Sequence, residues 1–422
     1  MSGRIPPINR KGGGVVSPLY RAYSAFPIPP APLSRVEIDL GALKKNFRAV
    51  RRHLAERAPL CTPRVIAVVK ADAYGHGVPA CVKALLEEGC DFFAVASLEE
   101  AMAVRRTCNE NHSNASILIL GYTHPVRAAE LAREDLIQTL LSLDYAEELR
   151  NAAEQADVTL RVHVALDSGM NRIGIPIRSP EEALAAAEGI RVLSDSPRLR
   201  LEGAFSHFAA ADAPKGSAEA DFTALQYERY AFFWEKLEEV GVQIALRHFA
   251  NSAAALYGSL PWLMEGVRVG ILLYGVDPCG GVLPLTPVMK LKTTVVHIHS
   301  LPAGEPLGYG CRFTADTPRV IATLPIGYAD GFLRSYEGAR VTLSHGEKEY
   351  SVPLVGRICM DQCMIDVTGV PAEVGDEVTL FGDTCDALSR LSSSAKTVEY
   401  ESLCLISARL PRVYIDSEKE GL

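Results

Sequence analysis

The stretch "VIAVVKADAYGHG", residues 65–77, joins a run of mostly β-branched apolar residues directly to a lysine, Lys70. Valine and isoleucine favour a buried strand, and Gly75 and Gly77 allow a tight turn after it. A strand of this kind that ends on a cation needs an explanation, because a charge is costly to remove from water. The stretch predicts a strand whose end presents Lys70 to a loop.

Further short apolar runs follow, separated by segments of helical periodicity such as 78–88 and 218–240. Alternating strands and helices are typical of a parallel sheet, and eight such strands suggest a (β/α)8 barrel of the TIM type that closes on itself. The eight predicted strands are 64–69, 91–96, 116–120, 136–140, 159–166, 199–205, 243–249 and 266–272.

The texture changes after Pro284, where β-branched runs broken by turns replace the helical patterns, as in "VMKLKTTVVHIHSL" at 288–301. Such runs predict a mainly antiparallel β domain. We therefore expect an α/β protein with three parts and a strand at 34–40 that is a candidate member of the β domain. The parts are a flexible, Pro- and Gly-rich extension at 1–33, the barrel at 34–285 and the C-terminal β domain at 286–422.

Composition excludes several classes of protein. The chain has 422 residues and a net charge of −8, without a cluster of Lys and Arg interleaved with aromatic residues, so we expect no nucleic-acid partner. The ten cysteines are irregularly spaced, and Cys359 with Cys363 lacks the second pair of a metal site. No run of eighteen apolar residues predicts a membrane span, and no continuous apolar core near the start predicts secretion. We expect a cytoplasmic protein with reduced thiols and no metal.

Polar residues recur where the predicted barrel strands end, and such ends meet at one mouth of a barrel. A partly desolvated lysine amine has a lowered pKa and can condense with an aldehyde. Tyr74 would lie close enough to Lys70 to bind an anion beside the amine, so a phosphate-bearing aldehyde fits. Judged by residue type alone, Lys70 is more often a surface lysine. The other polar groups at strand ends are 167–172, Ser206, His207, Asn251 and Ser252.

The lysine stretch is similar to the pyridoxal-phosphate lysine motif of the alanine racemases. The resemblance covers roughly residues 35–413, in the order of the family, and its motifs are long. It implies the barrel and β domain, pyridoxal 5'-phosphate as cofactor, and interconversion of L- and D-alanine, which supplies D-alanine for cell-wall peptidoglycan. The further blocks are "LDSGMNRIG" (166–174), "GAFSHFAAAD" (203–212), "HFANSAAAL" (248–256), "VRVGILLYG" (267–275), "LGYGCRFTAD" (307–316), "LPIGYADGF" (324–332) and "GRICMDQCMID" (356–366).

The resemblance also implies roles for single residues. Lys70 would hold the cofactor and serve as one catalytic base, and Tyr309 from the partner subunit of a homodimer would serve as the other. Racemisation requires two bases, because a proton removed from one face of Cα must be replaced on the other. The implied cofactor contacts are Tyr74, Ser252, Asn251 and the backbone of Gly270 and Ile271 around the phosphate, Arg268 at the pyridine nitrogen, His207 behind Arg268, and Arg172 at the ring oxygen. The implied substrate contacts are Arg172, Met360 and Asp361.

Two positions depart from the family pattern. Ala165 stands where many relatives carry a carbamylated lysine, so Arg172, expected to be buried, needs another partner such as chloride or the side chain of Asn171. Ala408 stands where the family usually has a tyrosine that touches the phosphate and narrows the substrate site. Both changes leave open a racemase of broader specificity that also accepts serine.

Two other functions compete with racemisation. A pyridoxal-phosphate decarboxylase on the same fold would place a carboxylate at the pyridine nitrogen and lack the second-base block, so Arg268 and Tyr309 argue against it. A single-domain, non-enzymatic pyridoxal-phosphate-binding protein would end near residue 280. The present chain continues for a further third of its length with site residues in it.

Overall fold

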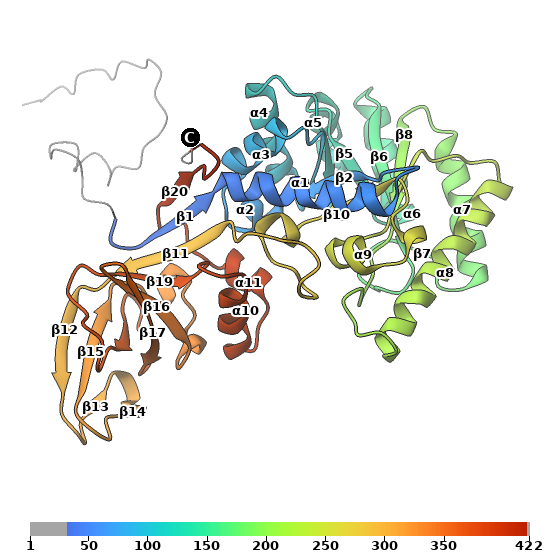
Figure 1. Cartoon of the computed structure of the whole chain (residues 1–422). Helices are drawn as coiled ribbons and strands as arrows, with labels where there is room; N and C mark the ends of the chain where they lie inside the picture. Colours follow the sequence, from blue (N-terminus) through green and yellow to red (C-terminus); the bar gives the residue numbers. More distant parts are fainter. Residues whose placement is uncertain (1–31, 420–422) are drawn as a thin grey trace, which may run out of the picture. The chain divides into compact units, whose positions relative to one another are not determined.

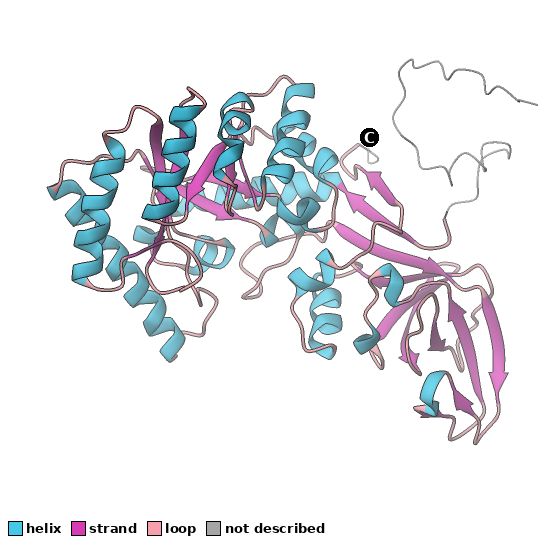
Figure 2. Cartoon of the chain, turned by 180° about the vertical axis from the view of Figure 1, so that it is seen from behind, coloured by secondary structure: helices cyan, strands magenta, loops and turns pink. Residues whose placement is uncertain are grey.

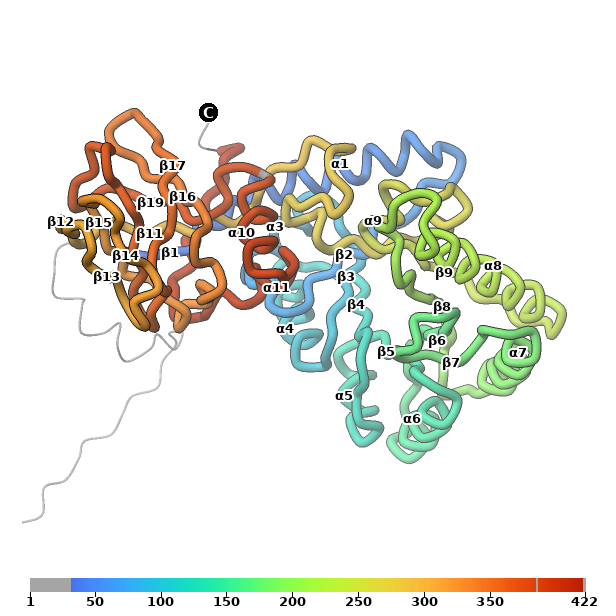
Figure 3. The backbone as a smooth tube through the Cα atoms, turned by 90° about the horizontal axis from the view of Figure 1, so that it is seen from below, coloured from blue at the N-terminus to red at the C-terminus, as the bar shows by residue number. Residues whose placement is uncertain are grey.

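Figure 1 shows the computed structural model, which describes residues 32–419. Within that range, eight parallel strands close into a barrel, because β5 pairs with β6 at one side and β10 pairs with β2 at the other. In Figure 3 the labels β2, β3, β4, β5, β6, β8 and β9 follow one another around this ring. The strands are β2 (Arg64–Val68), β3 (Phe92–Val95), β4 (Ser116–Ile119), β5 (Ile137–Leu140), β6 (Leu160–Asp167), β8 (Leu199–Phe205), β9 (Leu246–His248) and β10 (Gly266–Val269).

The eight predicted strands are confirmed, although some predicted ends extend too far. The strand predicted at 266–272 stops at Val269, because Ile271–Tyr274 turns into the short 3-10 helix η4. Every residue of β3 and of β5 is buried, as expected for parallel strands covered on both faces.

Four of the helices that cover the barrel begin after a serine that caps them. Ser97, Ser142, Ser179 and Ser217 each accept a backbone N–H from the first turn of the helix they precede, which satisfies one of its unpaired donors. Figure 2 shows these helices in cyan around the magenta strands. They are α1 (Leu40–Arg57), α3 (Val78–Glu87), α4 (Leu98–Glu110), α5 (Ala128–Arg133), α6 (Leu143–Gln155), α7 (Pro180–Ser194), α8 (Ala218–Glu239) and α9 (Ser252–Tyr257).

A mainly antiparallel sheet follows the barrel, as predicted. In the described residues its strands lie in the order β12, β15, β18, β17, β16, β19, β11, β1 and β20. The strand predicted at 34–40 is β1 (Arg35–Asp39), which pairs with β11 and β20 of this sheet. The other strands are β11 (Met289–Thr294), β12 (His297–Leu301), β15 (Arg319–Leu324), β16 (Arg340–His345), β17 (Lys348–Val355), β18 (Cys363–Asp366), β19 (Glu377–Phe381) and β20 (Arg412–Ile415).

Two helices in the C-terminal part were not predicted, α10 (Cys385–Ser394) and α11 (Glu399–Cys404). Neither begins with a side-chain cap, and α11 is only 6 residues long, so the sequence carries little sign of them. They matter because α11 reaches the barrel: the ring of Tyr400 lies 6.1 Å from that of Tyr74, centre to centre.

The extension predicted at 1–33 lies outside the described residues except for its last two positions. The predicted domain boundary after residue 285 falls between η4 and β11. Among the described helices, none has the length and apolar character needed to cross a membrane.

Candidate active site at the barrel mouth

Lys70 follows β2 by one residue and opens a left-handed turn. Residues 71–74 have φ between 52° and 56°, and Gly75 has φ 79°. A left-handed conformation costs roughly 1–2 kcal/mol for each residue other than glycine. Asp72 stabilises the turn by accepting the backbone N–H of Val78 at 2.8 Å, and Arg412 donates to the carbonyl of Gly75 at 3.3 Å. The lysine therefore sits on a strained turn that its surroundings hold in place.

The surroundings of Lys70 change its basicity. Burial lowers the pKa of the Lys70 amine, and the nearby positive charge of Arg172 lowers this pKa further. Cys404 at the end of α11 and Glu100 in α4 act in the opposite direction. The net lowering favours the neutral amine, which is the form that attacks an aldehyde.

Beside Lys70, three groups form a small cradle at the ends of the strands. The backbone N–H of Gly270 donates to the hydroxyl of Ser252 at 3.0 Å. A Cβ placed on Gly270 would lie 2.5 Å from the hydroxyl of Tyr74, so the absence of a side chain at 270 makes room for that hydroxyl. Burial raises the pKa of Tyr74, which keeps its hydroxyl protonated as a donor. The cradle suits an anionic group with several oxygens.

Asn251 has a structural task next to this cradle. Its side-chain oxygen accepts the backbone N–H of Ala254 at 3.0 Å and caps α9. The cap fixes the start of the helix, where Ser252 is the first residue. Asn251 therefore orients Ser252, whereas a direct contact of Asn251 with a cofactor stays a prediction.

Arg268 is almost entirely buried and lies at the centre of a hydrogen-bond network. Its Nη1 donates to Nδ1 of His248 at 2.8 Å, and its Nη2 donates to Nδ1 of His207 at 3.1 Å. It also donates to the carbonyls of Ser206, His248 and Phe249. Burial lowers the pKa of Arg268 to about 10, and no carboxylate among the described residues pairs with it. These hydrogen bonds use Nη1 and Nη2, and no described residue accepts a hydrogen bond from the Nε–H of Arg268.

The arginine fixes the state of both imidazoles, because a guanidinium can only donate. Nδ1 of His207 and of His248 must therefore be acceptors, so both rings are neutral. Burial supports this state, since it lowers the pKa of His207 to about 3 and that of His248 well below its ordinary value. The predicted contact between His207 and Arg268 is present in the structure.

The network continues into the barrel core through a residue that the sequence analysis missed. Nε2 of His248 lies 2.9 Å from Nδ1 of His163, and both side chains are fully buried. Gly203 makes this possible, because a Cβ at that position would lie 2.5 Å from the ring of His163. The available signal was a histidine in the middle of an apolar strand, which is unusual for a buried position.

Arg172 differs from expectation. Its side chain is exposed rather than buried, and it forms no ion pair with any carboxylate among the described residues. It does lie near the other groups of the mouth, because its charge lowers the pKa of both Lys70 and His207. Asn171, one of its predicted partners, instead accepts a hydrogen bond from Arg178 at 2.9 Å. Ala165 is buried at the end of β6.

The predicted site residues of the C-terminal part are exposed. Tyr309 is 69% exposed and lies between β13 (Pro306–Leu307) and β14 (Phe313–Thr314), which Figure 1 places far from the barrel strands. Met360 is 53% exposed, and Asp361 forms an ion pair with Arg409 at 2.6 Å. The structure of one chain brings the barrel residues together but does not bring Tyr309, Met360 or Asp361 to them.

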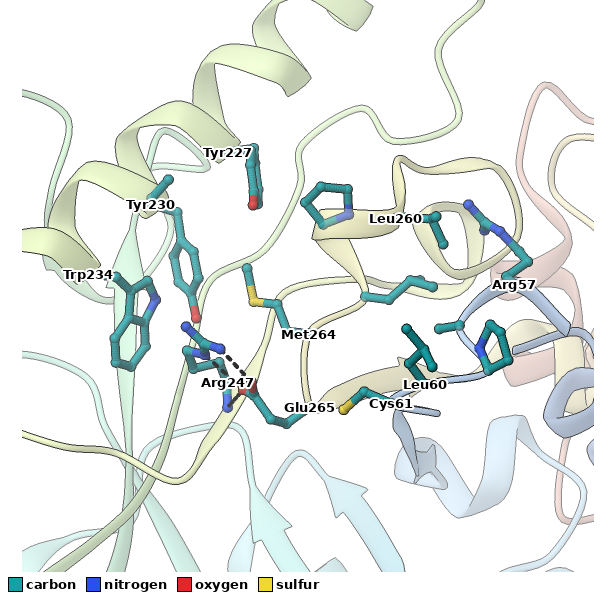
Figure 4. A pocket seen from close by; sticks show the side chains of 15 residues that line it. Arg57, Leu60, Cys61, Tyr227, Tyr230, Trp234, Arg247, Leu260, Met264 and Glu265 are labelled. Carbon is teal, nitrogen blue, oxygen red and sulfur yellow. Dashed lines mark hydrogen bonds and ion pairs between the residues drawn. The ribbon is translucent and has the colours of Figure 1, made fainter. Parts of the chain in front are cut away.

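A cleft of about 560 Å³ lies at the opposite end of the barrel (Figure 4). Its walls come from the segment before β2, from α8 and from the segment before β10, so it opens at the amino ends of the strands. Barrel active sites lie at the carboxyl ends, and Lys70 is at that other end. The lining includes Arg57, Leu60, Cys61, Tyr227, Tyr230, Trp234, Arg247, Leu260, Met264 and Glu265. Among the described residues, no three or more His, Cys, Asp or Glu side chains are grouped so that they could hold a metal ion.

Comparison with known proteins identifies the family. The family described as "Alanine racemase, N-terminal domain" matches residues 38–278, and "Alanine racemase, C-terminal domain" matches residues 288–414. The alanine racemase of Clostridium novyi is 40% identical over 390 residues, which cover 90% of this chain and 94% of the relative.

Solved structures of alanine racemases also resemble this chain. The alanine racemase of Clostridium difficile 630 superposes with a TM-score of 0.79 at 35% identity, covering 92% of this chain and 96% of the other. The alanine racemase of Bacillus anthracis with bound L-Ala-P gives a TM-score of 0.78 at 33% identity, covering 92% and 96%. The chain therefore belongs to the alanine racemase family.

Proposed function

We propose that this protein interconverts L- and D-alanine with pyridoxal 5'-phosphate as cofactor. The observation that carries the proposal is the position of Lys70. Its partly desolvated amine lies on a fixed turn, next to the cradle at Gly270 and near the guanidinium of Arg268. A lysine, an anion cradle and a ring-facing donor at one barrel mouth are the parts needed to hold this cofactor.

The residues present fit the cofactor in two places. The hydroxyls of Tyr74 and Ser252 with the backbone of Gly270 and Ile271 would hold its phosphate, and the free Nε–H of Arg268 would donate to its pyridine nitrogen. When bound, pyridoxal phosphate supplies an electron sink that makes the Cα proton of an attached amino acid acidic. Lys70 would then accept or donate that proton on one face of Cα.

Arg268 also distinguishes racemisation from decarboxylation. A guanidinium at the pyridine nitrogen donates a hydrogen bond but does not protonate the ring, so it weakens the electron sink and limits side reactions. A barrel decarboxylase would need a carboxylate at this place. Burial lowers the pKa of Arg268 only to about 10, so the group stays charged near neutral pH and remains a donor.

A second base has to come from outside the chain that carries Lys70. Tyr309 is exposed and far from the barrel of its own chain, which supports a homodimer in which each subunit lends Tyr309 to the other. Met360 and Asp361 would reach the substrate carboxylate in the same way. Mixing inactive Lys70→Ala and Tyr309→Phe chains tests this: random pairing should restore about a quarter of wild-type activity, as expected for symmetric dimers. No recovery after demonstrated subunit exchange would contradict the shared site.

Arg172 requires an anion that the chain does not supply. In a dimer that covers the mouth, an unpaired guanidinium would be costly, so we include a bound chloride beside Arg172 and Ala165 in the proposal. Activity should rise when chloride replaces a large organic anion at constant ionic strength. Ala165→Lys should remove this dependence if the new lysine is carbamylated, and equal chloride responses in both proteins would contradict the site.

The decisive experiment measures the reaction itself. The purified protein with pyridoxal phosphate is incubated with L-alanine, and D-alanine is followed by chirality-resolved chromatography, with Lys70→Ala as the inactive control. L-serine is included because Ala408 leaves the breadth of specificity open. In this proposal the product D-alanine serves peptidoglycan synthesis, and the enzyme acts in the cytoplasm. Absence of D-alanine formation by the cofactor-saturated wild type would overturn the proposed function.

A further inference from the structure

Glu100 connects the Lys70 turn to the neighbouring strand. This residue lies in the first turn of α4, and its Oε1 accepts the backbone N–H of Ala71 at 2.7 Å. Its Oε2 accepts the backbone N–H of Ala96, directly after β3, also at 2.7 Å. One carboxylate therefore joins the residue after Lys70 to the end of the next barrel strand.

The left-handed turn needs such an acceptor at its start. The first backbone N–H groups of a helical turn have no acceptor within the turn itself. The N–H of Ala73 reaches the carbonyl of Val69 at 3.0 Å, whereas the N–H of Ala71 reaches Glu100. Ionised acceptors form shorter and stronger hydrogen bonds than neutral ones. Glu100 thus stabilises a conformation that an alanine at position 71 otherwise rarely adopts.

The carboxylate does not complete the capping box of its own helix. The residues "SLEE" at 97–100 have the capping-box pattern, and the hydroxyl of Ser97 accepts the N–H of Glu100 at 3.3 Å. In a capping box the glutamate would bond the N–H of Ser97. Here its two oxygens bond Ala96 and Ala71 instead, so the side chain reaches outside α4 to the lysine turn.

We propose that Glu100 is a positioning residue for Lys70, which holds the lysine turn through the N–H of Ala71 and the end of β3 through the N–H of Ala96. Glu100 touches neither substrate nor cofactor in this role. It sets the direction from which the amine enters the site. The effect on catalysis rests on the proposed racemase function, whereas the effect on the backbone does not.

The test compares Glu100→Ala and the isosteric Glu100→Gln with Glu99→Gln as matched control. Glu99 precedes Glu100 on the same helix turn, and its side chain is 73% exposed with one long contact, 3.6 Å, to Arg127. Three properties are measured on the full-length, cofactor-loaded proteins: hydrogen exchange of the Ala71 and Ala96 amides, kcat and KM in both directions, and the melting temperature.

In Glu100→Ala, exchange at both amides should accelerate at least tenfold. We also expect kcat to fall about 10- to 100-fold with little change in KM, because displacing a catalytic group by about 1 Å can reduce the rate by that factor. In Glu100→Gln only one oxygen remains, so one amide should keep its protection. Glu99→Gln should match the wild type in all measurements.

Two results would overturn the proposal. Wild-type protection of Ala71 in Glu100→Ala would show that the carboxylate does not hold the turn. A lowered melting temperature with unchanged kcat would show that Glu100 contributes to stability alone. If the wild type does not racemise alanine, the proposed function fails, but exchange at Ala71 still decides whether Glu100 holds the turn.

Discussion

The barrel mouth and the surface around Tyr309 differ in how firmly their side chains are held. At the mouth, Arg268 donates to two imidazoles and three carbonyls, and the Lys70 turn is bonded at both ends. Tyr309 is 69% exposed in a small hairpin. The chain thus fixes by itself the half of the site that would hold the cofactor. It leaves Tyr309, the proposed second base, on an exposed surface, where we propose that a partner subunit covers it.

The largest expected effect on activity comes from a substitution of Lys70 at the barrel mouth. Lys70→Ala removes the proposed covalent anchor and one of the two proposed bases, so activity should fall by at least about 10⁴-fold. The visible absorbance of bound cofactor should disappear, and borohydride should trap cofactor on the wild type only. Mass spectrometry of the reduced protein checks the attachment site, and an adduct on any other lysine would contradict the assignment.

The second prediction concerns the exposed half. Tyr309→Phe removes the proposed second base, and a positioned base is worth about 10² to 10⁴ in rate. Because Lys70 remains, deuterium exchange at Cα should be lost for one enantiomer far more than for the other. Cofactor absorbance and melting temperature should stay at wild-type values, since the hydroxyl contributes nothing to the barrel network. Equal exchange of both enantiomers in mutant and wild type would refute the two-base assignment.

The same contrast explains which features could be predicted. β-Branched runs predicted the barrel strands, because a strand buried on both faces has a continuous apolar sequence. The left-handed turn had no such sign: "KADAY" contains ordinary helix formers, and the turn is held partly by Glu100 and Arg412, which are distant in the sequence. Tertiary contacts of this kind are invisible in local sequence.

Site residues follow the same rule. Lys70, Tyr74, Ser252 and Arg268 stand in long motifs, and the structure shows the barrel groups gathered at one mouth. Glu100 was hidden in a helix-capping pattern, and His163 in an apolar strand. The expected burial of Arg172 was wrong for a single chain, since burial depends on what covers the mouth.

A third prediction weakens the cradle without touching Lys70. Gly270→Ala places a methyl group 2.5 Å from the hydroxyl of Tyr74, so the two cannot keep their present positions. We expect roughly tenfold weaker cofactor binding, about 1.4 kcal/mol, which corresponds to one lost hydrogen bond to a charged group. Equilibrium titration of the cofactor-free protein measures this. Unchanged affinity would mean that the phosphate binds elsewhere.

The sharpest test of the difference between the two regions is a change in how stability depends on pH. His163 is fully buried, and burial lowers its pKa to about 3, against about 6.5 in the unfolded chain. Between these values the unfolded state binds a proton that the folded state does not, so stability falls as pH falls, by up to about 1.4 kcal/mol per pH unit. His163→Asn removes this contribution and should flatten the acid side of the stability curve by that slope.

Denaturant unfolding from pH 7 to pH 4 measures this change in slope, with the exposed His112→Asn as control. Tyr309→Phe, which belongs to the other region, should follow the wild-type curve at every pH. A His163→Asn curve parallel to the wild type would show that the core end of the network is not held neutral by burial, and the contrast between the two regions would then be confined to the residues nearest Arg268.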